Sequence, residues 1–217
     1  MAKKTWSLAV SLAVAMTLTG AADAANVLVF GDRAGERGSL AVDLTSLGHS
    51  VTNQAALPGN VSGFDTIWHV GAFTALTAGE QTLLASFLAT GGGIHLTGER
   101  PCCEVLNDSL QQFLTSVLKT PGVVVGDQGD QPLPYNFNPT AAGLVTQVPW
   151  PLVQWQPSAS GGMLGVSGDN ILVTANNGTV TGGVWESTDI SGDAGCVTLL
   201  MDVNWFSNAG IAGDPRI

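Results

Sequence analysis

The chain has 217 residues, a formal net charge of −10 and a charged fraction of only 11%. An acidic surface repels phosphate backbones, and the 7 Lys and Arg residues form no cluster, so a nucleic acid is not an expected partner. The length is that of one domain that can bury a hydrophobic core.

The first residues have the pattern of an export signal. Lys3 and Lys4 make a basic start, residues 6–18 are almost entirely apolar, and Ala22-Asp23-Ala24 fits a small-residue cleavage site. This order predicts a signal peptide over residues 1–24 and a mature single domain over residues 25–217. The alternative is an uncleaved anchor, but the apolar run is shorter than the ~20 residues that cross a bilayer. We therefore expect a secreted or periplasmic protein without a membrane span after signal cleavage.

Short apolar runs alternate with amphipathic segments through the first half of the chain. Helices are predicted over a segment that stops at Gly48, over one with the capping-box pair Thr77 and Glu80, and from about residue 101 to residue 118. Strands are predicted at 27–30, 50–52, 64–70 and 94–96. This rhythm predicts an α/β fold, a three-layer sandwich with a mostly parallel, flavodoxin-like sheet.

The second half differs in composition. Proline, glycine, Asn and Gln dominate residues 126–162, which predicts a long irregular excursion, either a lid or a packing arm. Strands that add to the sheet in antiparallel orientation are predicted at 163–166, 171–175, 183–186 and 196–201. Four tryptophans are either a sugar-stacking platform or, as we favour, part of the core; they are Trp150, Trp155, Trp185 and Trp205.

Several stretches resemble the class I glutamine amidotransferase-like superfamily. They are "NVLVFGD", "FDTIWHVGAF", "LTAGEQTLLASFLATGGGIHLTGE" and "GCVTLLMDVNWFSN". The closer likeness is to secreted, trehalose-utilisation-type relatives that lack the amidotransferase triad. Family members continue past the last motif into a closing helix, so the resemblance implies either that this helix is absent or that the chain is truncated after Ile217.

The resemblance also locates the position of the family nucleophile. In amidotransferases of this fold a cysteine sits on the turn after the matching strand, which here falls near Thr97-Gly98-Glu99 and holds no cysteine. His49, His69 and His95 all precede Arg100, so the late histidine of the triad is missing too. We predict that the protein is not an amidotransferase, and expect His69 and His95 to be packed in the interior.

Three cysteines remain to be explained. In an oxidising compartment we expect a disulfide between Cys103 and Cys196, or between Cys102 and Cys196, with the third thiol free or used between chains. No C-x-x-C pair or nearby histidine completes a zinc site, so no metal and no cofactor are predicted.

Carboxylates follow several of the predicted strands. Parallel strands would place Asp32, Glu99 and Asp202 along one edge of the sheet, with Arg100 and Asn204 close behind. Such a set suits a network of sugar hydroxyls, a hard cation or an acid and base pair. The alternative is that these side chains cap the following turns and helices.

Together these features favour a secreted, non-catalytic binding or structural module of the cell envelope. Its expected partner is a carbohydrate or an envelope protein. The alternative is a hydrolase that acts on carbohydrate or a related small substrate through Glu99 with Asp32 or Asp202.

Overall fold

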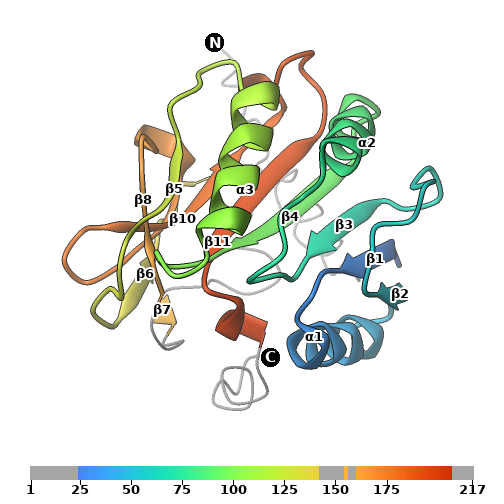
Figure 1. Cartoon of the computed structure of the whole chain (residues 1–217), viewed down its shortest axis with the longest axis horizontal. Helices are drawn as coiled ribbons and strands as arrows, with labels where there is room; N and C mark the ends of the chain where they lie inside the picture. The colour runs from blue at the N-terminus through green and yellow to red at the C-terminus, as the bar shows by residue number, and fades with distance from the viewer. Residues whose placement is uncertain (1–23, 142–153, 156–159, 207–217) are drawn as a thin grey trace, which may run out of the picture.

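A computed structural model describes residues 24–141, 154–155 and 160–206 of the chain (Figure 1). The predicted signal peptide, apart from Ala24, lies outside the described residues, as does Trp150. No helix within the described ranges has the length and apolar character needed to cross a membrane.

Five parallel strands form one half of a mixed sheet. In spatial order they are β2 (Ser50–Gln54), β1 (Asn26–Phe30), β3 (Thr66–His69), β4 (Gly93–Gly98) and β11 (Cys196–Met201). The order reverses direction between β1 and β3, so this half is doubly wound, as predicted. In sheets of this kind ligands bind beyond the carboxyl ends of the strands at the point of reversal.

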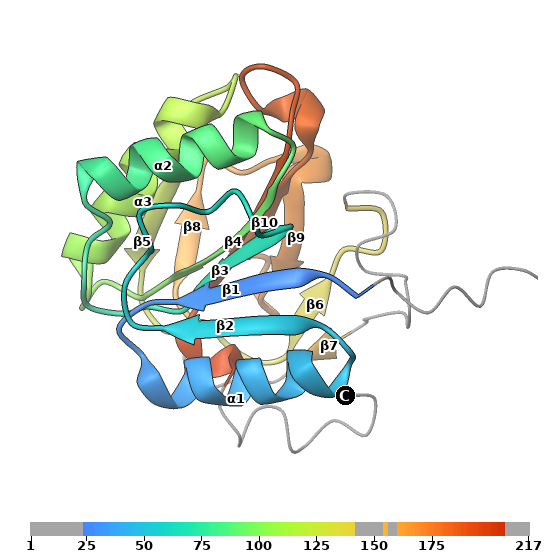
Figure 2. The same cartoon turned by 90° about the vertical axis from the view of Figure 1, so that its right-hand side faces the viewer.

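Helices cover both faces of the parallel half (Figure 2). Helix α1 (Ala34–Ser46) lies on one face, and α2 (Ala78–Ala89) and α3 (Glu104–Val117) lie on the other. Alternate residues of β1 therefore enter two different cores: Leu28 and Phe30 pack in the cluster that holds α2 and α3, whereas Val27 and Val29 pack in the cluster that holds Leu40 of α1. The three layers confirm the predicted sandwich.

The local signals for the first two helices are confirmed. The hydroxyl of Thr77 accepts the backbone N–H of Glu80, and the Glu80 carboxylate accepts that of Thr77, which makes the predicted capping box. Gly48, with φ of +94°, follows α1 directly after its C-cap residue. The third helix begins at Glu104 and not near Pro101, because residues 101–102 form a turn; the expected start is therefore wrong by one turn.

Antiparallel strands extend the sheet beyond β11. They are β10 (Val180–Trp185), β9 (Ile171–Thr174), β6 (Tyr135–Phe137) and β7 (Gln154–Trp155), while β5 (Val124–Gln128) pairs with β8 (Gly162–Leu164), which pairs with β10. Short 3-10 turns occur at η1 (Gly168–Asn170), η2 (Ser187–Asp189) and η3 (Val203–Phe206). The prediction that strands of the second half join the sheet in antiparallel orientation is confirmed.

The excursion at 126–162 is more regular than its composition predicts. Its described part contains β6, which pairs with both β7 and β9, and Tyr135 in that strand is fully buried. Trp185 and Trp205 are also buried, which supports the core interpretation for these two residues.

The predicted disulfide is not formed. Cys196 lies opposite Gly93 at the amino end of the β4 and β11 pair, whereas Cys102 and Cys103 follow Gly98 at the carboxyl end. The strand between these ends advances about 3.3 Å per residue, so the Cα atoms lie well beyond the ~7 Å that a disulfide spans. All three thiols are free, and the expected link from Cys196 to Cys103 or Cys102 is wrong.

Candidate functional site

The carboxyl ends of β1, β3, β4 and β11 border a pocket of about 230 Å³, which we call the strand-end pocket. Each lining residue follows one of these strands, because parallel strands deliver their next residues to one edge of the sheet. The lining residues are Arg33, Ala72, Phe73, Glu99, Arg100, Cys102, Cys103, Asp202, Val203 and Asn204. Of the predicted site residues, Glu99, Arg100, Asp202 and Asn204 are thus brought together.

Glu99 occupies the turn directly after β4, where the resemblance places the nucleophile. Its backbone is fixed by Asn107 of α3, whose amide accepts the Glu99 N–H at 2.9 Å and donates to the Glu99 carbonyl at 2.7 Å. Its carboxylate accepts the N–H of Val203 at 3.0 Å, and the residue is only 7% exposed. Burial raises the pKa of Glu99 to about 7, helped by the charge of Asp202 and opposed by the Val203 hydrogen bond.

Asp202 is the second buried carboxyl of the pocket. Its backbone lies in the left-handed region at φ of +85°, and Oδ1 accepts the N–H of Asn204 at 2.9 Å. Oδ2 is buried and has no hydrogen-bond partner among the described residues. Burial raises the pKa of Asp202 to about 6, although hydrogen bonds from the backbone and the side chain of Asn204 act against this. A buried acceptor without a donor is costly, so this oxygen is suited to a ligand group.

Asp32 follows β1 but does not line the strand-end pocket. Its two carboxylate oxygens accept the backbone N–H groups of Ala72, Phe73 and Thr74 at 2.9, 2.9 and 2.7 Å. Partial burial alone would raise the pKa of Asp32, but these hydrogen bonds outweigh it and the net pKa is lowered. Asp32 therefore fixes the loop after β3. It has the turn-capping role that the sequence offered as the alternative to ligand binding, and it does not line the strand-end pocket with Glu99 and Asp202.

Two arginines and an aromatic ring make the rim of the pocket. The Arg33 guanidinium lies 5.6 Å from the centre of the Phe73 ring, and it forms a bidentate pair with Glu36 at 2.5 and 3.3 Å. A single guanidinium nitrogen of Arg100, Nη1, lies 2.8 and 2.9 Å from the two carboxylate oxygens of Asp130. Both guanidinium groups are thus anchored from outside the pocket, while Phe73 is 62% exposed.

The two strand histidines are packed in the interior, as predicted. His69 lies against Phe30, with ring centres 5.1 Å apart, and Nδ1 of His95 lies 2.7 Å from the Thr198 hydroxyl. Burial lowers the pKa of His69 to about 4 and that of His95 to about 3. Neither ring lines the strand-end pocket.

A metal is not favoured at this edge. Within the described ranges no three His, Cys, Asp or Glu side chains are grouped so that they could hold a metal ion. The hard-cation interpretation of the strand-end carboxylates therefore has no support from the geometry.

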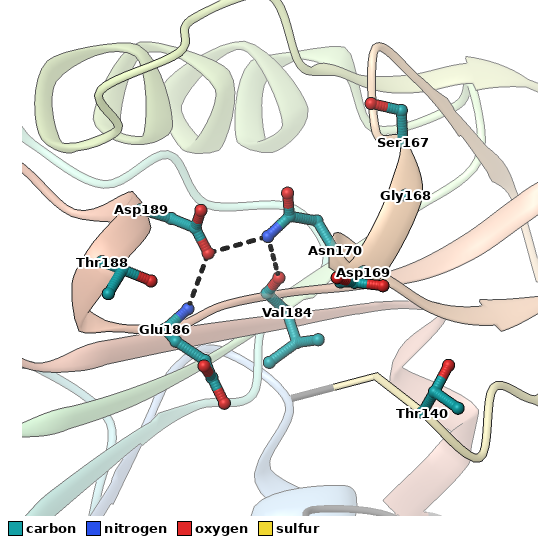
Figure 3. Close-up of a pocket in the computed structure, with 9 residues that line it drawn as sticks. All are labelled: Thr140, Ser167, Gly168, Asp169, Asn170, Val184, Glu186, Thr188 and Asp189. Atoms are coloured by element: carbon teal, nitrogen blue, oxygen red, sulfur yellow. Dashed lines mark hydrogen bonds between the residues drawn. The ribbon is translucent and has the colours of Figure 1, made fainter. Parts of the chain in front are cut away.

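A second pocket, of about 420 Å³, lies beside β9 and β10 (Figure 3). Its central polar groups bind one another: Asp189 accepts the Asn170 side-chain amide at 2.9 Å and the Glu186 backbone N–H at 3.1 Å, and the same amide donates to the Val184 carbonyl at 2.9 Å. This network holds η1 and η2 together. The strand-end pocket, with its unpaired buried oxygen, is the better candidate site.

Sequence reasoning missed several contributors to that pocket, among them Arg33, Phe73 and Val203. Arg33 directly follows Asp32, and Phe73 follows Gly71 at the end of β3, so the strand-end rule that found Glu99 could have found both. Val203 contributes its backbone N–H, for which a sequence carries no signal.

Comparison with protein-family models and with curated proteins finds no match to this sequence. Solved structures do match. The mmIFT52 N-terminal domain is 14% identical, with a TM-score of 0.58 over 87% of this chain and 91% of that one. A ThuA-like protein from Parabacteroides merdae is 13% identical, with a TM-score of 0.50 over 81% and 78% of the two chains.

A third match is part of a larger enzyme. The exo-beta-1,4-mannosidase Op5Man5 from an Opitutaceae bacterium is 14% identical, with a TM-score of 0.51 over 88% of this chain but only 33% of that one. At such identities the likeness concerns the fold alone. Sheet order, helix placement and these matches agree that the chain has the class I glutamine amidotransferase-like fold.

Proposed function

We propose that this protein is a non-catalytic binding module of the cell envelope that holds a small polyhydroxylated ligand, such as one sugar residue, in the strand-end pocket. The observation that carries the proposal is the Asp202 Oδ2 atom, a buried acceptor that finds no donor among the described residues, in a pocket that also contains Glu99. A ligand hydroxyl supplies the missing donor.

The chemistry of the two carboxyls suits hydroxyl groups. A hydroxyl both donates and accepts, and Glu99, with a pKa of about 7, is present in both protonation states near neutral pH. Asp202 is then an acceptor while protonated Glu99 is a donor. The exposed Phe73 ring at the rim offers an apolar face to the C–H groups of a sugar ring.

The pocket size limits the ligand. Its volume of about 230 Å³ lies below the roughly 300–1,000 Å³ of sites for drug-sized molecules. A single sugar ring or a short polyol matches this volume better than an oligosaccharide does. Several residues of a polymer would have to extend beyond the rim formed by Arg33 and Phe73.

The thiols do not favour an amidase. A nucleophilic cysteine needs a base within hydrogen-bond reach, and the two strand histidines are buried away from the pocket. Burial also raises the pKa of Cys103 to about 12, which opposes thiolate formation. These features support binding over acyl transfer.

Calorimetric titration of the mature protein with a panel of monosaccharides and their alditols tests the proposal. We expect binding by at least one compound, weakened about tenfold or more by Asp202→Asn, which corresponds to ~1.4 kcal/mol. Asp169→Asn, in the second pocket, is the matched control and should bind normally. Binding that survives Asp202→Asn unchanged, or no binding by any compound, would contradict it.

One observation favours the alternative, a carbohydrate hydrolase. A glycosidase needs a carboxylic acid that is still protonated near pH 7 and a second carboxylate nearby, and Glu99 and Asp202 share one pocket. The release of reducing ends from oligosaccharides separates the two functions. A hydrolase loses turnover in Glu99→Gln but keeps binding, whereas a binding module shows no turnover before the change.

The envelope location rests on the leader sequence. We propose export followed by cleavage after Ala24, which leaves Ala25 as the first residue. N-terminal sequencing of protein recovered from an exporting bacterial host tests this, and an intact Met1 would contradict it.

A further inference from the structure

We propose that Cys102 and Cys103 are a reversible dithiol and disulfide site in the wall of the strand-end pocket, oxidised by a small-molecule disulfide. The inference goes beyond the proposed ligand binding and does not depend on it.

The backbone brings the two adjacent side chains together. Neighbouring residues point to opposite faces of a strand and diverge on a helix, but this pair lies in the turn between β4 and α3. The N–H groups of Cys102 and Cys103 both donate to the Arg100 carbonyl, at 2.7 and 3.3 Å. The two sulfur atoms are 2.6 Å apart, and both residues line the pocket.

The surroundings give the two sulfurs different roles. Cys102 is exposed, so an oxidant in solution can reach its sulfur, and its side chain is hydrogen-bonded to the Arg100 guanidinium. Cys103 is buried, and burial together with the Cys102 hydrogen bond raises its pKa to about 12. Cys102 is therefore the attacking sulfur, and Cys103 is the sulfur that completes the exchange.

The reaction is a balanced thiol and disulfide exchange. The Cys102 thiolate attacks one sulfur of the oxidant, forms a mixed disulfide and releases the first small thiol. Cys103 then loses its proton to water and attacks the Cys102 sulfur, which breaks the mixed disulfide and releases the second small thiol. The protein loses two electrons and two protons, and the oxidant gains them as two thiols.

Ring closure acts on the same turn that positions Glu99. Cys103 is the N-cap residue of α3, and Asn107 in the first turns of that helix holds both the N–H and the carbonyl of Glu99. A change in the Cys102 and Cys103 backbone is therefore transmitted to the candidate site through a short, fully hydrogen-bonded connection.

The sequence offers a clean chemical test. The folded wild-type protein is incubated with oxidised glutathione, its remaining thiols are alkylated with iodoacetamide in denaturant, and it is cleaved after glutamate. Cleavage at Glu99 and Glu104 releases residues 100–104, which contain both vicinal cysteines and not Cys196. We expect this peptide to be two hydrogens lighter than the dithiol and unalkylated, and to take two alkyl groups after reduction with dithiothreitol.

Three other outcomes of the oxidation experiment would contradict the proposed disulfide between Cys102 and Cys103. Two alkyl groups on residues 100–104 after oxidation, a stable glutathione adduct in the wild-type protein, or a disulfide between chains would each do so. Cys196→Ser is the matched control and should close the ring as the wild type does. In Cys103→Ser the glutathione adduct should persist on Cys102, because no second thiol displaces it.

A spectroscopic measurement tests the link to the pocket. The amide signals of Glu99 and Asn107 should shift between the reduced and oxidised protein, while that of Asp169 beside the second pocket should not. Unmoved Glu99 and Asn107 signals in a protein that has closed the ring would overturn its coupling to the strand-end pocket.

Discussion

At the scale of single residues, Glu99 makes stability depend on pH with an unusual sign. Its pKa is about 7 in the folded protein, whereas the unfolded chain has the ordinary value of 4.5. Between these two pH values the folded protein holds a proton that the unfolded chain has released. Stability therefore falls as pH rises through this window. In Glu99→Gln, which keeps an acceptor for Val203, we expect the fall to shrink by ~1–3 kcal/mol.

Urea unfolding at a pH of about 5 and again at about 7.5 measures this difference. Glu104→Gln changes an exposed carboxyl in the first turn of α3 and is the matched control, with the wild-type fall retained. A wild-type protein that gains stability between these two pH values would contradict the prediction.

Asp32 supports a different prediction, because it holds a loop and not a ligand. Asp32→Ala leaves the N–H groups of Ala72, Phe73 and Thr74 without their acceptor, and we expect a loss of ~1–3 kcal/mol in the free energy of unfolding. Asp32→Asn keeps one acceptor oxygen and should lose less. Asp108→Ala, at an exposed position of α3, is the control in the same denaturant titration; equal effects of the two alanines would refute the assigned role.

The candidate site was partly predictable at this scale. The rule that parallel strands end at one edge finds Glu99, Arg100, Asp202 and Asn204, because each follows a strand that its apolar run makes visible. The same rule cannot predict that the Asp32 carboxylate accepts three backbone N–H groups and is therefore not available to a ligand. That outcome depends on the path of the loop after β3, which has no periodic pattern.

At the scale of elements, Gly126 shows how tightly β5 approaches the turn after β4. Its φ is +74°, and an added Cβ would lie 2.0 Å from the Asn107 side chain and 2.5 Å from the Glu99 carbonyl oxygen. Gly126→Ala therefore has both a strained backbone and a collision with atoms that hold the candidate site. We expect a loss of about 3 kcal/mol or more in the free energy of unfolding.

A second glycine separates these two effects. Gly178 has φ of +86° and open space around its Cβ position, so Gly178→Ala carries the strain without the collision and should cost ~1–2 kcal/mol. Thermal melts of the two variants measure the difference. Equal melting temperatures would show that β5 does not press on the turn as the structure indicates.

Elements were predictable where local chemistry and burial agree. The Thr77 and Glu80 pair, the apolar run of β1 and the glycine after α1 act through neighbours in sequence. β6 was missed because it lies in a polar, proline-rich stretch and is held by pairing with the distant strand β9. The turn before α3 was missed because it depends on backbone bonds to the Arg100 carbonyl.

At the scale of the whole molecule, the two cores are joined by one sheet. β4 and β11 pair over their full length, which connects the doubly wound strands to the antiparallel half through β10. Residues of β11 such as Leu199 and Met201 are fully buried against α3 and its neighbours. Among the described residues, the pairing of β11 with both β4 and β10 thus couples the two halves through continuous hydrogen-bonded strands.

This continuity predicts a single cooperative unfolding transition. Leu28→Ala in β1 and Val173→Ala in β9 each open a cavity at a fully buried position, one in the parallel half and one in the antiparallel half of the sheet, and each should cost ~2–4 kcal/mol. Both variants should shift the entire transition, measured by far-ultraviolet circular dichroism, without splitting it. Val42→Ala, at a position of α1 that is 68% exposed, is the control and should change stability by less than ~0.5 kcal/mol. A two-step curve in Leu28→Ala, with the second step at the wild-type midpoint, would mean that the antiparallel half is stable without the parallel strands.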